Sequence, residues 1–172
     1  FMLGIVFGIC KAESYLHYPA PEEETPCTVI DGEMDPYDLV QRTTAYIERF
    51  GAPKKNYLQL INFALQKDQT IPDIKDEPGQ ELILRHLKKQ ELLTGKKPFL
   101  VLDNLRSLSN YIENDADSYR PIGVWLKNLR GLGYTTLVLD HTGKAAPGPR
   151  GTSSKTDWAN VCLKIEPDGP AG

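Results

Sequence analysis

A short apolar run that ends in a carboxylate constrains the fold of this chain more than any other feature. Residues 99–102 are Phe, Leu, Val and Leu, and Asp103 follows them directly. An uninterrupted apolar segment of this length, bounded by polar residues, is typical of a strand buried on both faces of a parallel sheet. Because ligands bind at the carboxyl ends of the strands in open α/β folds, Asp103 is predicted to lie at a site.

Two further apolar segments lead to side chains that can do chemistry. Residues 27–31 lead to Glu33, and residues 134–139 lead to His141. An aspartate after a single strand is also a common turn former or helix cap, and one strand end alone favours that interpretation. Three strand ends favour a catalytic site, because parallel strands bring Glu33, Asp103 and His141 to one edge of the sheet.

For two of these residues, a purely structural role is the alternative to a catalytic one. The carboxylate of Glu33 fits a position just before a helix, where a negative charge complements the helix dipole. The ring of His141 fits a histidine that packs in the core beside Asp140, and spacing alone does not separate the two interpretations. The combination of three strand ends favours catalysis for Glu33.

Helices and strands alternate along the chain. The predicted helices cover residues 1–17, 36–50, 77–93 and a segment through Trp125 and Leu129, and the predicted strands cover residues 27–31, 57–61, 99–103, 134–139 and 161–165. Asp35 and Pro36 supply a cap and a first-turn proline for the second helix, whose predicted apolar stripe includes Leu39, Val40 and Ile47. This alternation indicates right-handed βαβ units and a mostly parallel central sheet flanked by helices.

The composition is that of a soluble globular protein. The chain has 172 residues, a hydrophobic content of 40% and a net charge of −3, so it fits one domain and has no overall attraction for nucleic acid. Its longest apolar stretch, residues 1–10, is too short to cross a membrane. Cys10, Cys27 and Cys162 are predicted to be buried reduced thiols, which is typical of a cytoplasmic protein.

Any contact with nucleic acid therefore depends on local cations and aromatic rings. Lys144, Arg150 and Lys155 lie in a segment rich in glycine, proline and serine, which by default is a solvated loop. Tyr111 and Tyr119 flank an acidic loop and are candidates for base stacking, although exposed tyrosines are common in loops. Arg106, Asp115 and Asp117 belong to the same region, and an ion pair with one of the carboxylates is the alternative to a DNA contact for the arginine.

No phosphate-binding loop of the nucleotide-hydrolysing α/β proteins occurs in the sequence. Such a loop ends in Gly-Lys-Ser/Thr, and its backbone amides hold the phosphates. Gly95-Lys96 is followed by lysine, and Gly143-Lys144 is followed by alanine. Residues 1–17 nevertheless begin abruptly as an apolar helix, as expected of the helix that follows such a loop.

A series of motifs runs through the chain in a specific order. They are Asp31-Gly32-Glu33-Met34, the strand 99–103 with residues 104–108, Glu113-Asn114-Asp115, residues 141–144 and residues 150–153. Together they resemble the core of RecA-like ATPases, most closely the RepA-type hexameric replicative helicases and their plasmid, phage and mobile-element relatives. The resemblance implies a RecA-like three-layer α/β fold over residues 1–166, without the strand of the phosphate-binding loop. It also implies a Walker A loop directly before Phe1, and a disordered tail or truncated end at residues 167–172.

The resemblance implies a role for each of the three strand-end residues, with ATP and Mg²⁺ as cofactors. Glu33 corresponds to the catalytic carboxylate that polarises the attacking water. Asp103 corresponds to the Walker B aspartate that orders Mg²⁺ through its water shell. His141 corresponds to the residue that senses the γ-phosphate. These residue types suit phosphoryl transfer, in which catalysis is mostly positioning and charge stabilisation.

The resemblance also implies partners. Members of this family form rings or filaments with ATP at subunit interfaces, and two loops face single-stranded DNA; the matching cations here are Arg106, Lys144, Arg150 and Lys155. An arginine finger, worth roughly 10³–10⁵ in rate in related enzymes, falls at about Asn160 in this chain, where Lys164 or Arg150 could substitute. Two alternatives stay open: a regulatory ATPase that acts on protein partners, and a nucleotide-free interaction module with a RecA fold.

Overall fold

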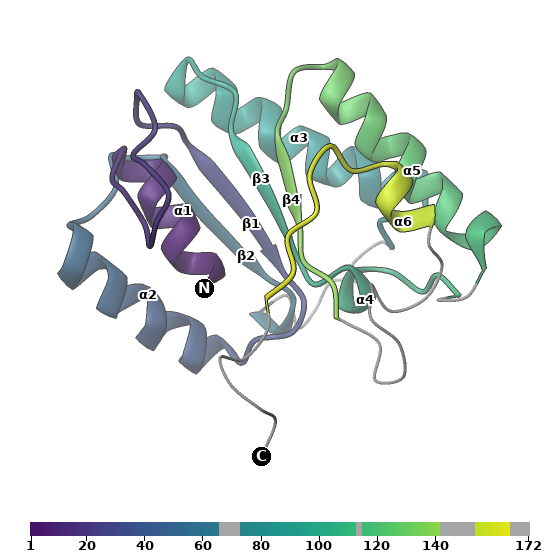
Figure 1. Cartoon of the computed structure of the whole chain (residues 1–172), viewed down its shortest axis with the longest axis horizontal. Coiled ribbons are helices and arrows are strands. Elements are labelled where there is room, and N and C mark those ends of the chain that lie inside the picture. Colours follow the sequence, from purple (N-terminus) through teal and green to yellow (C-terminus); the bar gives the residue numbers. More distant parts are fainter. Residues whose placement is uncertain (66–72, 113–114, 142–153, 166–172) are drawn as a thin grey trace.

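A four-stranded parallel sheet forms the centre of the fold (Figure 1). The computed structural model describes residues 1–65, 73–112, 115–141 and 154–165. The strands are β1 (Cys27–Asp31), β2 (Leu58–Asn62), β3 (Phe99–Asp103) and β4 (Thr136–Val138), in the spatial order β2–β1–β3–β4. Every neighbouring pair is parallel, and Asp31 of β1 is aligned with Asp103 of β3. The predicted parallel sheet is confirmed, and the strand ends of β1 and β3 lie at one edge.

Helices cover both faces of this sheet (Figure 1). They are α1 (Met2–Lys11), α2 (Pro36–Phe50), α3 (Glu77–Thr94), α4 (Leu105–Leu108), α5 (Ala116–Gly131) and α6 (Ser154–Asp157), and a 3-10 helix, η1 (Phe63–Leu65), follows β2. Val29 and Val101 pack in one core with side chains of α1 and α2. Ile30 and Leu102 pack in a second core with side chains of α3 and α5. Since successive side chains of a strand point to opposite faces, β1 and β3 are buried on both sides, as their apolar sequences predicted.

The predicted start of α2 is confirmed, but its buried face differs from the predicted stripe. The side chain of Asp35 accepts a hydrogen bond from the backbone N–H of Tyr37 at 2.8 Å, and Pro36 occupies the first turn. Leu39 is buried, whereas Val40 is 62% exposed and Ile47 is 38% exposed. The reason is aromatic packing between the first two helices: the rings of Tyr46 and Phe50 lie against Phe7 of α1, with centroids 5.5 and 6.2 Å away. This contact turns Val40 and Ile47 toward solvent.

Two predictions near the ends of the chain were wrong. The first helix ends at Lys11, where Ala12 adopts a left-handed conformation, instead of continuing to residue 17. Residues 161–165 form no strand, and the side chains of Val161, Leu163 and Ile165 are exposed. Cys10 and Cys27 are buried free thiols as predicted, but Cys162 is exposed, because the strand expected to bury it does not form. The predicted tail at residues 167–172 lies outside the described residues.

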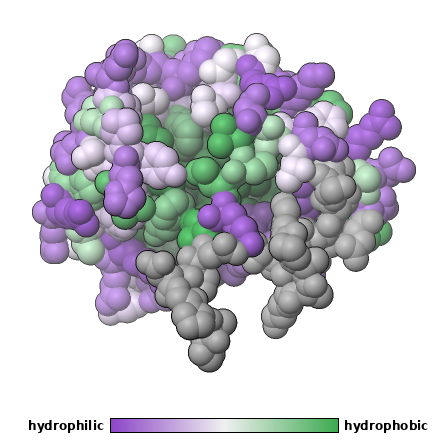
Figure 2. All heavy atoms as spheres, viewed as in Figure 1, coloured by the Kyte–Doolittle hydropathy of each residue, from purple (hydrophilic) through white to green (hydrophobic). Residues whose placement is uncertain are grey.

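Coverage of the sheet is uneven on the face shown in Figure 2. Apolar atoms gather at the centre of that face, over the sheet between α1 and the segment that follows α6. All three residues of the edge strand β4 are only half-buried, whereas every residue of β1 is buried. Within the described part of the chain, no helix combines the length and apolar character needed to cross a membrane.

Candidate functional site

The carboxyl edge of the sheet brings the predicted residues Glu33, Asp103 and His141 into one region. The backbone N–H of Gly32 donates a 2.7 Å hydrogen bond to the carbonyl oxygen of Asp103, which ties the turn after β1 to the end of β3. Glu33 Oε2 and His141 Nε2 are 3.5 Å apart. Asn104, the residue after Asp103, contacts both of these side chains. Two carboxylates and an imidazole therefore lie close together at this edge of the sheet.

Asn104 is the central polar contact of this site. Its side-chain Nδ2 donates a hydrogen bond to Glu33 Oε2 and lies 2.9 Å from His141 Nε2. Its Oδ1 accepts a hydrogen bond from the backbone N–H of Ser107 at 3.0 Å and caps α4. The buried amide is thus fixed at one end by the helix and orients two charged or ionisable groups at the other.

Two more polar residues hold the turn that carries Glu33. Asp31, which is 1% exposed, accepts hydrogen bonds from the backbone N–H groups of Glu33 and Met34 at 3.0 and 3.1 Å. Asn62, at the end of β2, donates from Nδ2 to the second oxygen of Asp31 and to the carbonyl of Met34, both at 2.8 Å. Sequence reasoning missed Asn62 and Asn104 as site residues. The available signal was a polar residue at, or directly after, the end of each neighbouring strand.

The electrostatics of this edge favour a cation. Burial and, to a smaller extent, the negative charges of Asp31 and Glu33 raise the pKa of Asp103 to about 6, while His141 acts against this shift. Carboxylate oxygens are ligands that Mg²⁺ accepts, and Mg²⁺ usually keeps several waters and uses only one or two protein carboxylates. No cluster of three His, Cys, Asp or Glu side chains among the described residues could hold a metal directly. A single carboxylate such as that of Asp103 is compatible with Mg²⁺ that keeps water and phosphate oxygens as its other ligands.

Gly32 allows the close approach of β1 and α4 at this site, and we predict that replacing it will be costly. A Cβ at this position would lie 2.9 Å from Ser107 Cβ and 2.9 Å from Leu108 Cδ2. Gly32→Ala is therefore expected to lower the free energy of unfolding by roughly 1–3 kcal/mol, as overpacking does in other cores. Gly131→Ala is the matched control, because nothing lies within 4 Å of the added methyl group there. Urea unfolding of both variants makes the comparison, and equal stability would contradict the packing argument.

Of the four cations predicted to contact DNA, the structure describes Arg106, which is exposed, and Lys155, which is buried. Arg106 is exposed on α4, directly after the site. Lys144 and Arg150 lie outside the described residues. Lys155 is 8% exposed, and its Nζ donates to Asp140 Oδ2 at 2.6 Å and to the hydroxyl of Tyr111 at 2.7 Å. Because a buried ammonium with these partners does not face an exposed phosphate, the structure argues against Lys155 as a DNA contact.

The candidate stacking residues are also buried. Tyr111 and Tyr119 are 6% and 3% exposed, and their rings meet edge to face with centroids 5.7 Å apart. They pack in the same core as Trp125, which is also buried. The tyrosines are therefore core residues that do not offer a free face to a base.

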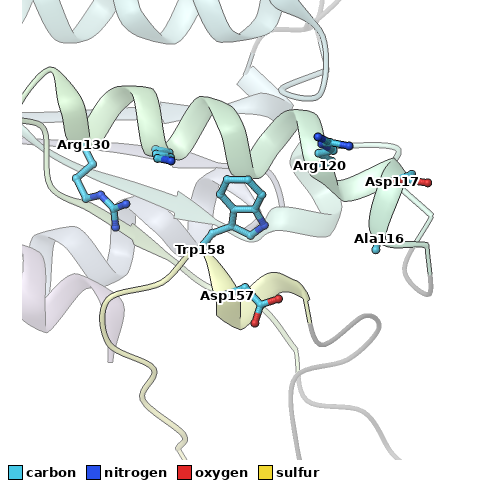
Figure 3. Close-up of a pocket in the computed structure, with 7 residues that line it drawn as sticks. Ala116, Asp117, Arg120, Arg130, Asp157 and Trp158 are labelled. Carbon is cyan, nitrogen blue, oxygen red and sulfur yellow. The ribbon is translucent and has the colours of Figure 1, made fainter.

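A separate pocket of about 480 Å³ lies between α5 and α6 and includes none of the strand-end residues. In Figure 3, Trp158 points toward α5, between Arg120 and Arg130. Arg130 Nη1 donates a 2.9 Å hydrogen bond to Asn160 Oδ1, at the position where the resemblance places an arginine finger. Asp117 and Asp157 also line the pocket, so its cations and carboxylates are mixed and no single ligand charge is favoured.

The comparisons with known proteins agree with this geometry at the level of the family. A family model described as an AAA domain matches residues 1–147, which include Glu33, Asp103, Asn104 and His141. No curated protein and no solved structure matches the chain. The family points to an ATPase of the P-loop NTPase type. The chain belongs to the AAA domain family.

Proposed function

We propose that this chain is the ATP-hydrolysing core of a Mg²⁺-dependent, RecA-like motor that acts on DNA, of the RepA-type replicative helicase or recombination class. One observation carries the proposal: Asn104 contacts both Glu33 and His141 directly beside Asp103 at the carboxyl edge of the sheet. A base, a metal-ordering carboxylate and a phosphate sensor are the groups that phosphoryl transfer requires at that edge.

Each side chain has a defined task in this proposal. Glu33 accepts a hydrogen bond from the attacking water and takes up its proton as the water oxygen bonds to the γ-phosphorus and the bond from that phosphorus to the oxygen of the leaving ADP breaks. Asp103 would hold Mg²⁺ through the water shell of the ion, and bound Mg²⁺ would supply charge neutralisation on the phosphates. His141 donates a hydrogen bond to the γ-phosphate. Asn104 keeps the carboxylate of Glu33 and the ring of His141 in a fixed relation.

The proposal requires a phosphate-binding loop beside the carboxyl edge of the sheet. In the family that the chain resembles, this loop comes directly before a helix like α1. One observation fits a phosphate-binding loop beside the site: the amino end of α1 points toward the edge of the sheet where α4 begins (Figure 1).

The test is hydrolysis of ATP by the full-length protein with and without single-stranded DNA. The proposal predicts Mg²⁺-dependent hydrolysis that single-stranded DNA stimulates. Hydrolysis without any response to DNA would favour a regulatory ATPase that acts on protein partners. Failure to bind ATP would favour a nucleotide-free interaction module. The proposal also includes a homo-oligomer, either a ring or a filament, which sedimentation of the same samples tests.

The segment after His141 provides a second test, on DNA binding. We expect Lys144→Ala combined with Arg150→Ala to weaken binding of single-stranded DNA and to flatten its salt dependence by about one unit per lost phosphate contact. The control is Lys88→Ala with Lys89→Ala, which removes the same charge from exposed positions on α3. Filter binding across a salt series is the measurement. Equal slopes for the two double variants would remove Lys144 and Arg150 from the proposed DNA path.

A further inference from the structure

A buried lysine contacts Asp140, the residue directly before the proposed phosphate sensor His141. The proposed chemistry does not use the carboxylate of Asp140. Lys155 of α6 is among the few buried charged side chains of the described residues. Its Nζ donates to Asp140 Oδ2 at 2.6 Å and to Tyr111 Oη at 2.7 Å. Tyr111 is itself fixed by the edge-to-face contact with Tyr119. The ammonium is thus held between a carboxylate and a rigid aromatic pair.

Asp140 connects this ammonium to the site. Its Oδ2 accepts from Lys155, while its Oδ1 accepts a 3.0 Å hydrogen bond from the backbone N–H of His141. The ring of His141 then lies 2.9 Å from Asn104 Nδ2 and 3.5 Å from Glu33 Oε2. A continuous series of polar contacts therefore runs from Lys155 to Glu33.

Stability alone is a weak explanation for this ion pair. Removing an ammonium and a carboxylate from water costs several kcal/mol per ion, and apolar residues of the same volume often replace such pairs without loss. Burial acts to lower the pKa of Lys155, but the hydrogen bonds to Asp140 and Tyr111 outweigh it, and the pKa lies above its ordinary value. The lysine is therefore charged at neutral pH and fixes the direction of the Asp140 carboxylate.

We propose that Lys155 is a positioning residue for ATP hydrolysis: it holds Asp140, and Asp140 holds the backbone of His141 at the γ-phosphate. The catalytic part of this inference rests on the proposed function. Without Lys155, the carboxylate of Asp140 turns toward solvent, the hydrogen bond to the His141 N–H is lost, and the ring of His141 leaves its place beside Asn104 and Glu33.

The experiment compares four variants of the full-length protein. Lys155→Met keeps the length of the side chain and removes its charge, Lys155→Arg restores a cation, and Tyr111→Phe removes one hydroxyl. Lys127→Met, at an exposed position on α5, is the matched control. We expect Lys155→Met to lower kcat about tenfold, with the KM for ATP unchanged, since residues that orient site groups typically contribute 10–100-fold. Lys155→Arg should recover part of this loss, and Lys127→Met should match the wild type.

Two further measurements separate positioning from simple stability and from failure of the proposed function. In an Asp140→Asn background, Lys155→Met should have little additional effect on kcat, because both act through one contact. The NMR signal of the His141 ring, assigned by its loss in His141→Gln, should shift in Lys155→Met whether or not the wild type hydrolyses ATP. An unshifted ring signal with normal kcat and reduced stability would overturn the inference. Should Lys155→Met fail to fold, Tyr111→Phe must produce the ring shift, and an unchanged spectrum of that variant would overturn the inference equally.

Discussion

Replacing Glu33 with Gln in the full-length protein is expected to reduce ATP hydrolysis by at least ~10²-fold while nucleotide binding stays intact. Glutamine has nearly the same shape, and its amide oxygen can still accept the hydrogen bond from Asn104 Nδ2. It cannot take up a proton from water at neutral pH, so the loss falls on the chemical step. Single-turnover hydrolysis and equilibrium binding of a fluorescent ATP analogue measure the two quantities separately.

Glu48→Gln is the matched control for this substitution. Glu48 is exposed on α2, so the same change of charge occurs away from the strand ends. Its hydrolysis rate should equal that of the wild type. Normal hydrolysis by Glu33→Gln would remove Glu33 from the catalytic role, and loss of nucleotide binding in that variant would point to a binding role instead.

Replacing Asp103 with Asn is expected to act in opposite directions on function and on stability. The variant should lose most of the Mg²⁺-dependent part of ATP binding, because a neutral amide does not order metal-bound water as a carboxylate does. The unliganded protein should become more stable at neutral pH, because the negative charge of Asp103 is buried near those of Asp31 and Glu33.

The pH dependence of stability follows from the direction of the pKa shift. The pKa of Asp103 is about 6 in the folded protein and about 4 in an unfolded chain. The folded state therefore favours the protonated form of Asp103. The resulting stabilisation of the folded protein is fully present below about pH 4 and is lost as the pH rises through 6. Above that range, the free energy of unfolding of Asp103→Asn should exceed that of the wild type by roughly 1 kcal/mol, after allowance for screening of a half-buried group.

Urea unfolding of both proteins at about pH 4 and pH 7.5, without Mg²⁺, tests this prediction. The difference in stability should be larger at the higher pH, where the wild type carries the additional buried charge. A variant that is less stable than the wild type at neutral pH would show that the carboxylate is stabilised by contacts other than those described. Binding of ATP that is equally dependent on Mg²⁺ in both proteins would remove Asp103 from the metal site.

The parts of the fold that the sequence predicted best are those in which burial dictates residue type. The strand 99–103 was predicted to the residue, because a segment buried on both faces must be apolar along its whole length. Asp35 and Pro36 marked the start of α2, because an N-cap and a first-turn proline satisfy backbone requirements that do not depend on the rest of the fold.

The parts that sequence could not predict depend on contacts between distant segments. Lys155 lies in a polar segment whose composition is typical of a solvated loop. Its burial depends on Asp140, which follows β4, and on Tyr111, which follows α4. Nothing in the sequence distinguishes Asn62 and Asn104 from other polar residues. Only the parallel register of the sheet places their strand ends beside the turn that carries Glu33. Residues 161–165 alternate as a strand does but stay exposed, because an alternating pattern does not by itself supply a neighbouring strand.

A crystal structure of the full-length protein with Mg²⁺ and a non-hydrolysable ATP analogue tests the central claim most directly. The claim is that Glu33, Asp103 and His141 form one phosphoryl-transfer site at the carboxyl edge of the sheet. We expect the terminal phosphate to lie beside Glu33 and His141, with a metal-bound water at the carboxylate of Asp103. A nucleotide bound elsewhere on the protein, with these three side chains remote from its phosphates, would contradict the claim.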